Sequence, residues 1–316
     1  MDAPSPRAVF SLRERAVDAV EIMDDPASDP DMLRNTYEQF RYVNGLVSGT
    51  WTTYRRDIRP RLSHTRPKTL LDIGSGGGDV ARTLARWAAR DGLLLDVTAI
   101  DPDPRAHDYA TSLPRMPGLS FRRAFSADLV AEGARFDFVV SNHVLHHLSA
   151  QELGGLLFDS ERLVRDGGRV LHGDIERNAL AYVGFGLVTW PFFRNSFIRA
   201  DGLTSIRRSF TAAELQAAVP PPWRVDRESP SRLVLRFDAP VSGSSSSSAT
   251  VSSAGSSSSS SSSSPNVTVP AERDVPAGSP RPDDPSSAPG QPFGPGAAGP
   301  EASVAPGGDS SGATDA

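Results

Sequence analysis

The stretch LLDIGSGGGDV, at positions 70–80, places an acidic residue and four glycines between two apolar runs. A glycine cluster between a buried strand and a helix lets a ligand approach the backbone closely at the N-terminus of that helix. The pattern alone does not identify the ligand, because enzymes that bind dinucleotides also place glycines there. It predicts a binding turn, and a tight strand-to-helix turn without a ligand is the alternative.

Short apolar runs alternate with amphipathic segments through residues 67–240, which we interpret as the main domain. The runs predict strands, and apolar residues at three- and four-residue spacing predict helices. Two capping boxes, Ser149 with Glu152 and Thr211 with Glu214, mark helix starts. The predicted strands cover 69–73, 94–100, 119–124, 136–141, 169–173, 223–227 and 232–237, and the predicted helices cover 79–90, 105–113, 149–165 and 211–218. This alternation predicts an α/β fold with a doubly wound, mostly parallel, seven-stranded sheet whose last two strands are antiparallel.

Two further regions depart from this alternation. Residues 1–66 contain three stretches with helical spacing, at 9–23, 32–47 and 51–62, and predict an N-terminal helical cap. Residues 176–209, after the fifth predicted strand, are more than a crossover needs and are rich in large apolar and aromatic side chains. Core packing explains part of this composition. The excess predicts a lid over the binding site of an apolar or aromatic small molecule.

Composition limits the remaining possibilities. Residues 241–316 consist mostly of Ser, Pro, Gly and Ala and predict a disordered tail. The chain has no cysteine, which excludes disulfides and Cys-ligated metals. A net charge of −5 gives no case for a nucleic-acid partner. The longest apolar run, 179–193, is shorter than the roughly 20 residues that span a bilayer. We expect a cytoplasmic protein, and the sequence does not set its oligomeric state.

Polar residues end four successive predicted strands. Asp72 and Asp79 flank the glycines and would repel a pyrophosphate. Asp101 ends the second strand, where a carboxylate can accept hydrogen bonds from both hydroxyls of a ribose. Asp128 follows the third strand and Asn142 ends the fourth. Together they predict a ligand that carries an adenosine and has a positively charged or zwitterionic other end.

Four segments resemble the successive binding motifs of the class I S-adenosylmethionine-dependent methyltransferases: LLDIGSGGGDVARTLA, VTAIDPDP, AFSADL and FDFVVSNHVLHHL. The resemblance covers about residues 70–237, including LVRDGGRVLHGDI at the fifth strand, and implies the Rossmann-like fold of that family with S-adenosyl-L-methionine as cofactor. It implies that Gly74, Gly76 and Gly78 line the methionine part of the cofactor, and that Asp72 faces its amino group, Asp101 the ribose, Asp128 the adenine and Asn142 the methionyl region.

Three histidines, His143, His146 and His147, follow the fourth predicted strand. A sulfonium methyl is already activated, but a hydroxyl acceptor benefits from a base near neutral pKa, and one of these histidines is a candidate. A structural turn is the alternative. A metal site is not predicted, because no cluster of carboxylates lies near them in the sequence. His172, inside the fifth strand, is expected in the core, and Asp174 is expected to orient a base, bind the acceptor or cap a helix.

The resemblance implies methyl transfer to a small aromatic, polyketide-like or quinone-like acceptor, with O-methylation favoured. DIERNALAYVGF and SIRRSFTAAEL are similar to a bacterial subgroup that modifies polyketides or quinones. Two alternatives share the cofactor: a C-methyltransferase acting on a quinone precursor, and a catalytically silent cofactor-binding scaffold. A nicotinamide oxidoreductase is a third alternative, disfavoured by Asp72 and Asp79.

Overall fold

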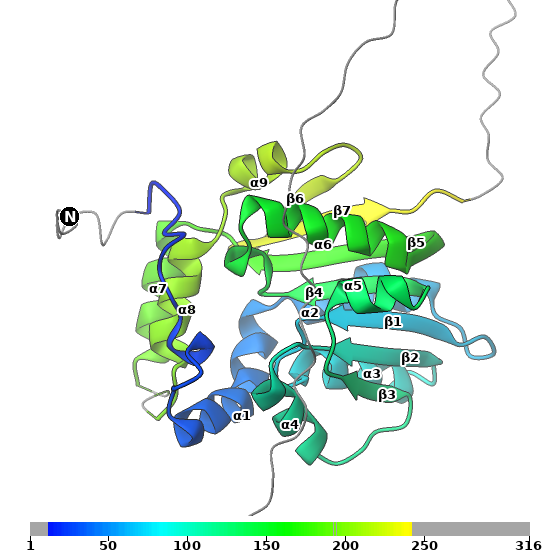
Figure 1. Cartoon of the computed structure of the whole chain (residues 1–316), viewed down its shortest axis with the longest axis horizontal. Coiled ribbons are helices and arrows are strands. Elements are labelled where there is room, and N and C mark those ends of the chain that lie inside the picture. The colour runs from blue at the N-terminus through cyan, green and yellow to red at the C-terminus, as the bar shows by residue number, and fades with distance from the viewer. Residues whose placement is uncertain (1–11, 192, 194, 242–316) are drawn as a thin grey trace, which may run out of the picture. The chain divides into compact units, whose positions relative to one another are not determined.

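The computed structural model describes residues 12–191, 193 and 195–241. In that part of the chain seven strands form one sheet in the order β3-β2-β1-β4-β5-β7-β6 (Figure 1). The strands are β1 (Lys68–Ile73), β2 (Leu95–Ile100), β3 (Leu119–Arg122), β4 (Phe136–Asn142), β5 (Val164–Ile175), β6 (Arg224–Glu228) and β7 (Arg232–Asp238). The first five strands are parallel to one another, whereas β7 is antiparallel to both β5 and β6. The predicted doubly wound, mostly parallel sheet is confirmed.

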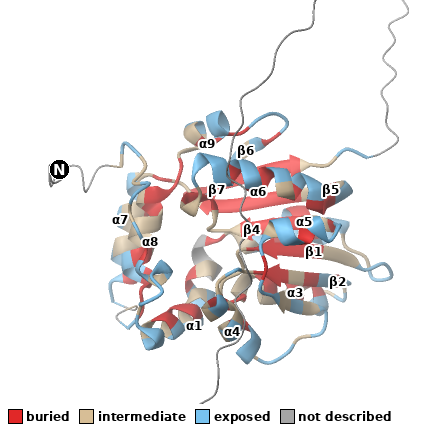
Figure 2. Ribbon diagram, in the orientation of Figure 1, coloured by how far each residue is buried: buried red, intermediate tan, exposed pale blue. Residues whose placement is uncertain are grey.

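Alternating side chains build one apolar layer on each face of the sheet, so the strands are mostly buried (Figure 2). Leu70 of β1 packs in a cluster with α3 and Tyr54, whereas its neighbour Leu71 packs in a second cluster with α5, α6 and α9. The helices of the sheet region are α3 (Asp79–Arg90), α4 (Pro104–Ser112), α5 (Ser126–Ala131), α6 (Ala150–Leu163) and α9 (Ala212–Ala218). Both capping boxes predicted from the sequence open their helices, α6 and α9.

Two helical stretches precede the sheet. Helix α1 (Pro30–Val47) is capped by Asp29, whose carboxylate accepts two backbone N–H groups of the first turn. The second stretch begins as α2 (Thr50–Thr53) and continues through a π-helical turn, Tyr54–Ile58, and a 3-10 turn, Arg59–Arg61. Both stretches confirm the corresponding helix predictions.

The segment 12–24, called the strap below, runs beside α8 (Ile198–Arg208) as irregular backbone with one 3-10 turn, η2 (Ile22–Asp24) (Figure 1). The predicted helix over 9–23 is therefore wrong for its described part, and residues 9–11 lie outside the described residues. Tertiary hydrogen bonds take the backbone groups that a helix would have used internally. They join Ala16 N–H to Arg207 O (3.0 Å), Ile22 and Met23 N–H to the Asp201 carboxylate (2.7 and 3.0 Å), and the Arg177 guanidinium to the carbonyls of Leu12 and Arg13 (3.1 and 3.2 Å).

The insertion after β5 forms α7 (Ala179–Thr189) and α8, which pack against each other (Figure 1). Several large apolar side chains of the α7 region are exposed: Leu180, Val183, Leu187, Val188 and Trp190. Phe197 instead packs with Leu33 and Tyr37 of α1. Among the described residues, no helix is both long and apolar enough to cross a membrane.

Helix α5 is not predicted from the sequence, because six residues are too few to show a helical period. The predicted tail falls on residues 242–316, outside the described residues, and stays a prediction.

Candidate functional site

A cavity of about 710 Å³ opens at the carboxyl ends of β1, β2 and β4. This is the edge of a doubly wound sheet where ligands bind, because the chain order reverses there and neighbouring loops separate. The glycine turn and Asp101 line one end of the cavity, which we call the glycine end. His143, His146, His147 and Glu21 line the other, the histidine end. Helices α1, α6 and α8 and the strap supply the remaining walls.

Gly76 leaves the glycine end open. Its φ of 51° is a conformation that side chains rarely adopt, and a Cβ added there would meet nothing within 4 Å. Its N–H donates to Asp101 Oδ2 at 2.8 Å, which fixes the loop against the end of β2. Gly74 also lines the cavity, as the sequence predicted, and so does Gly77.

Gly78 has a different role from the predicted one. It does not belong to the cavity lining. Its φ is 79°, and a Cβ there would lie 2.4 Å from the ring of Phe121 in β3. Glycine at this position therefore allows the start of α3 to pack on β3, rather than allowing a ligand to approach.

Asp72 is a buried carboxylate without a partner. The residue is only 1% exposed, lines the cavity, and its Oδ2 accepts no hydrogen bond. Burial, and next the charges of Asp79 and Asp101, raise the pKa of Asp72 well above its usual range. Burial also raises the pKa of Asp79, although Asn44 Nδ2 donates to it at 2.9 Å. Among the described residues, no cationic side chain at the glycine end pairs with Asp72, so a positively charged group of a ligand could do so.

Asp101 lies where the sequence placed it. Its Oδ1 accepts the Asp103 N–H at 2.9 Å while Oδ2 holds Gly76, and it lines the cavity. Asn142, at the end of β4, also lines the cavity. Asp128 departs from the prediction: it is exposed, lies outside the lining, and accepts the Phe125 N–H at 2.8 Å to cap α5.

At the histidine end, His146 is enclosed between two carboxylates. It is 2% exposed, and its Nδ1 lies 2.9 and 3.0 Å from the two oxygens of Asp174. Its Nε2 lies 3.2 Å from Glu21 Oε1, as an ion pair without the alignment of a hydrogen bond. Burial alone would lower the pKa of His146, but Asp174 and Glu21 outweigh it and raise the pKa to about 9. This imidazole is therefore protonated at neutral pH.

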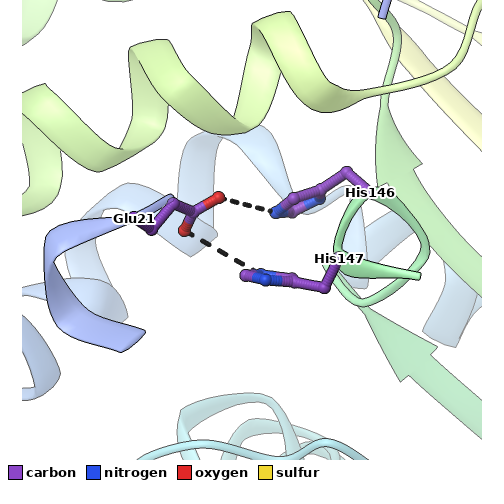
Figure 3. Close-up of side chains that lie close together, drawn as sticks. All are labelled: Glu21, His146 and His147. Atoms are coloured by element: carbon purple, nitrogen blue, oxygen red, sulfur yellow. Dashed lines mark ion pairs between the residues drawn. The ribbon is translucent and has the colours of Figure 1, made fainter. Parts of the chain in front are cut away.

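The strap supplies two carboxylates that local sequence spacing did not connect with these histidines, and Figure 3 shows one of them, Glu21. Glu21 is 3% exposed and lies 3.8 Å from His147 Nε2, and Asp24 Oδ2 lies 3.3 Å from His147 Nδ1. Glu21 precedes His146 by more than a hundred residues, so no local spacing could have indicated the contact. The expectation that no carboxylates surround the histidines is wrong.

His143 differs from the other two histidines in backbone and environment. Its φ of 58° is unusual for a residue other than glycine, and its N–H donates to Gly173 O at 2.9 Å. The side chain lines the cavity, with Nδ1 3.5 Å from Asp174 Oδ1 and Nε2 without a hydrogen-bond partner. Strained backbone of this kind is concentrated at functional sites.

His172, by contrast, is the core residue that the sequence predicted. It is fully buried, stacked on Trp223, and its ring nitrogens face the hydroxyls of Ser141 (2.8 Å) and Ser160 (3.1 Å). Burial lowers its pKa to about 3, so it remains neutral. Asp174 caps no helix; it accepts the His146 N–H at 2.9 Å and holds the rings of His146 and His143.

The insertion contributes to the cavity mainly through α8. Ile198, Gly202 and Ser205 of α8 line it, together with Phe185 of α7. Leu180, Val183, Leu187 and Val188 of α7 are exposed, so the large apolar side chains of the insertion line the cavity only in part.

Comparisons with known proteins agree with this architecture. Residues 50–218, more than half of the chain, match the family described as "Methyltransferase domain". A ubiquinone biosynthesis O-methyltransferase from Methylocella silvestris is 34% identical over 156 residues, which is 47% of this chain and 58% of that protein. The corresponding protein of Cereibacter sphaeroides is 36% identical over 121 residues, which is 36% of this chain and 46% of that protein. The chain thus spans about half the length of these curated relatives.

A solved structure supports the fold independently. The plantazolicin methyltransferase BpumL, in complex with a pentazolic desmethylPZN analog and SAH, superposes with a TM-score of 0.51 at 12% identity, over 69% of this chain and 93% of that one. At this identity the likeness is one of fold alone. The sheet order, the glycine turn and the family match lead to one conclusion: the chain belongs to the methyltransferase domain family and has its Rossmann-like fold.

Proposed function

We propose that this protein is an S-adenosylmethionine-dependent methyltransferase that methylates a hydroxyl of a small aromatic, quinol-like acceptor. The observation that best supports this cofactor is the Asp72 carboxylate at the glycine end, which is buried and has an oxygen without a hydrogen-bond partner. An uncompensated buried charge is costly, and a ligand ammonium placed there would offset that cost. A nicotinamide dinucleotide would instead bring further negative charge.

The residues of the glycine end fit the rest of such a cofactor. Asp101 faces the cavity from the end of β2 and can accept hydrogen bonds from ribose hydroxyls while it holds Gly76. Residues 124–127 and Leu156 line the neighbouring wall, so we assign adenine contacts to these rather than to the Asp128 side chain. When bound, S-adenosylmethionine supplies an activated methyl group on a sulfonium sulfur.

We assign the base to His143. Asp174 faces its Nδ1 and favours the tautomer in which Nδ1 carries the proton, so that Nε2 keeps a free lone pair. The acceptor hydroxyl would give its proton to this Nε2 as its oxygen takes the methyl group, and the bound cofactor would leave as the neutral thioether. His146 is unsuited, because carboxylates occupy both of its nitrogens and it is already protonated.

The acceptor side of the cavity supports an aromatic substrate. Met23, Phe40, Phe185 and Ile198 add apolar surface to the cavity wall. The relatives from Methylocella silvestris and Cereibacter sphaeroides are ubiquinone biosynthesis O-methyltransferases, which suggests a quinone precursor as acceptor. A base beside the acceptor favours O-methylation over C-methylation. A cytoplasmic location and an acceptor other than nucleic acid belong to the same proposal, since the net charge of −5 offers no broad basic surface.

Calorimetric titration with S-adenosylhomocysteine, with NAD as the parallel control, tests the cofactor. We expect binding of the first and none of the second; the reverse would identify an oxidoreductase. Incubation with S-adenosylmethionine and a set of catechols and phenols, followed by mass spectrometry, then tests the reaction. Binding without any methylated product across O-, C- and N-acceptors would favour a silent scaffold.

A further inference from the structure

Glu21, His146 and His147 present three ligand atoms to one point of the histidine end (Figure 3). The Nε2 atoms of the two histidines face opposite oxygens of the same carboxylate, at 3.2 Å for His146 and 3.8 Å for His147. Bonds of about 2.0–2.2 Å from a metal to His and carboxylate ligands leave neighbouring ligand atoms roughly 3 Å apart. The observed spacing therefore requires only a small adjustment to enclose an ion.

The opposite nitrogen of each ring faces a second carboxylate. His146 Nδ1 lies 2.9 Å from Asp174, and His147 Nδ1 lies 3.3 Å from Asp24. A histidine that binds a metal usually donates its other ring N–H to a carboxylate, which fixes the tautomer and makes the ligand nitrogen more basic. Both histidines have this arrangement, and at His146 the ion would take the place of the Nε2 proton that now faces Glu21.

The burial of Glu21 and His146 distinguishes this cluster from an ordinary surface ion pair. His146 is only 2% exposed, and its buried Nε2 has no hydrogen-bond partner. All three residues also line the cavity, so an ion held by them would keep coordination positions open toward a ligand. Ser205 Oγ donates to Glu21 Oε1 at 2.8 Å and orients that carboxylate.

We propose that Glu21, His146 and His147 form a site for one divalent transition-metal ion, open to the acceptor side of the cavity. Two imidazoles and one carboxylate are a donor set that suits Zn²⁺, Fe²⁺, Co²⁺ or Ni²⁺ better than Mg²⁺ or Ca²⁺, which prefer oxygen. Arg208 lies 3.8 Å from Glu21 and 3.7 Å from Asp24 and offsets part of their charge. Asp174 adds a further negative charge behind His146.

A second group, His143 with His146 and Asp174, has similar spacing. It is the weaker candidate, because Asp174 already accepts the His146 N–H and ring N–H and the Ile175 N–H. With Asp174 as a ligand, His146 would have to bind the ion through Nδ1, the nitrogen that now pairs with Asp174.

The role of the ion rests on the proposed function. An ion beside His143, whose ring centre lies 6.4 Å from that of His146, would hold an oxygen of the acceptor while His143 removes the proton. An acceptor with two adjacent hydroxyls could then bind through one oxygen and be methylated on the other. This deepens the proposed substrate class to catechol-like molecules.

The test uses full-length, tag-free protein treated with a chelator and then titrated with Co²⁺, followed by its visible absorption, and with Zn²⁺, followed by elemental analysis. We expect one ion per chain, and its loss in Glu21→Gln and His147→Asn. Asp24→Asn, which removes only the outer partner of His147, should weaken binding about 10–100-fold. His64→Asn is the matched control, because His64 is exposed and far from the cavity lining.

Binding of S-adenosylhomocysteine, at the other end of the cavity, reports whether each variant is folded. Failure of the wild-type protein to bind an ion stoichiometrically would overturn the proposal, as would unchanged binding in both ligand variants. Loss of binding in His143→Asn alone would assign the ion to the second group instead. A protein that binds the ion but not S-adenosylhomocysteine would refute the proposed function and leave the metal site standing.

Discussion

The glycine end and the histidine end of the cavity are both rich in carboxylates, but Asp72 at the first is unpaired, whereas those at the second are paired with histidines. At the glycine end, Asp72 is buried with an oxygen that accepts no hydrogen bond, and burial raises its pKa. At the histidine end, Asp174 and Glu21 are equally buried, yet histidines face both of them. Burial opposes ionisation there too, but His146 and His143 outweigh it for Asp174 and lower its pKa.

This difference indicates that the carboxylate of Asp72 serves to bind a ligand, whereas those of Asp174 and Glu21 stabilise the structure. A buried carboxylate without a partner costs stability and is tolerated where a ligand will pair with it. Paired groups instead hold segments together, here the strap, the turn after β4 and the end of β5. Changes at the glycine end should therefore alter binding, and changes at the histidine end should alter turnover or folding.

The largest effect should come from the base. His143→Ala should lower kcat about 10²–10⁴-fold, because the acceptor proton loses its nearest acceptor. The affinity for S-adenosylhomocysteine should change much less, since His143 is assigned to the acceptor proton and not to the cofactor. Steady-state kinetics and calorimetry on the same preparation measure both. A variant with normal kcat would remove His143 from the reaction.

The free energy of unfolding should distinguish the two kinds of carboxylate. Asp174→Asn removes the partner of a buried, charged His146 and should cost about 3–5 kcal/mol. Asp72→Asn should cost nothing or stabilise the protein at neutral pH. The reason is that a carboxyl whose pKa is raised by folding disfavours the folded state above its unfolded pKa. Denaturant unfolding of both variants without ligands is the measurement, and equal losses would contradict the comparison.

Asp101→Ala tests the cofactor side alone. The loss of hydrogen bonds to ribose should weaken S-adenosylhomocysteine binding by about 1.5–3 kcal/mol, as for bonds to a charged group. Part of that loss comes from the Gly76 loop, which Asp101 also holds. Asp108→Ala provides a neighbouring control, since Asp108 is exposed on α4 and lies outside the cavity lining. Equal affinity in wild type and Asp101→Ala would place the ribose elsewhere.

The sequence predicted the glycine end better than the histidine end, for a physical reason. Strand β1, the glycine turn and α3 are consecutive, so apolar periodicity and turn residues place Asp72 and Gly76 directly. Position in the sequence was less informative about what each residue faces: a side chain at Gly78 would clash with Phe121, and Asp128 caps α5. The histidine end combines segments far apart in the chain. The spacing that suggested a helix at 9–23 could not reveal that Asp201 and Arg177 take the backbone groups of the strap.

Cofactor affinity should also depend on pH through Asp72. Because its pKa is raised, lowering the pH protonates it, and a neutral carboxyl no longer attracts an ammonium group. Below that pKa the affinity should fall by at most about tenfold per pH unit. Asp79 and Asp101 face Asp72 and have raised pKa values too, so they add a shallower dependence. Calorimetry across pH should give a flatter profile for Asp72→Asn than for wild type, and identical profiles would exclude Asp72 as the partner.

The smallest effects should come from two adjacent glycines within α6. A Cβ added at Gly154 or Gly155 would meet no atom within 4 Å, so alanine should stabilise the helix by about 0.5–1 kcal/mol at either position. Only Gly155 lines the cavity, beside Leu156 and close to the wall assigned to adenine. Both variants should resist denaturant slightly better, but only Gly155→Ala should bind S-adenosylhomocysteine less tightly. If both bind it as wild type does, the adenine does not approach α6, and the glycine end extends less far along the sheet than proposed.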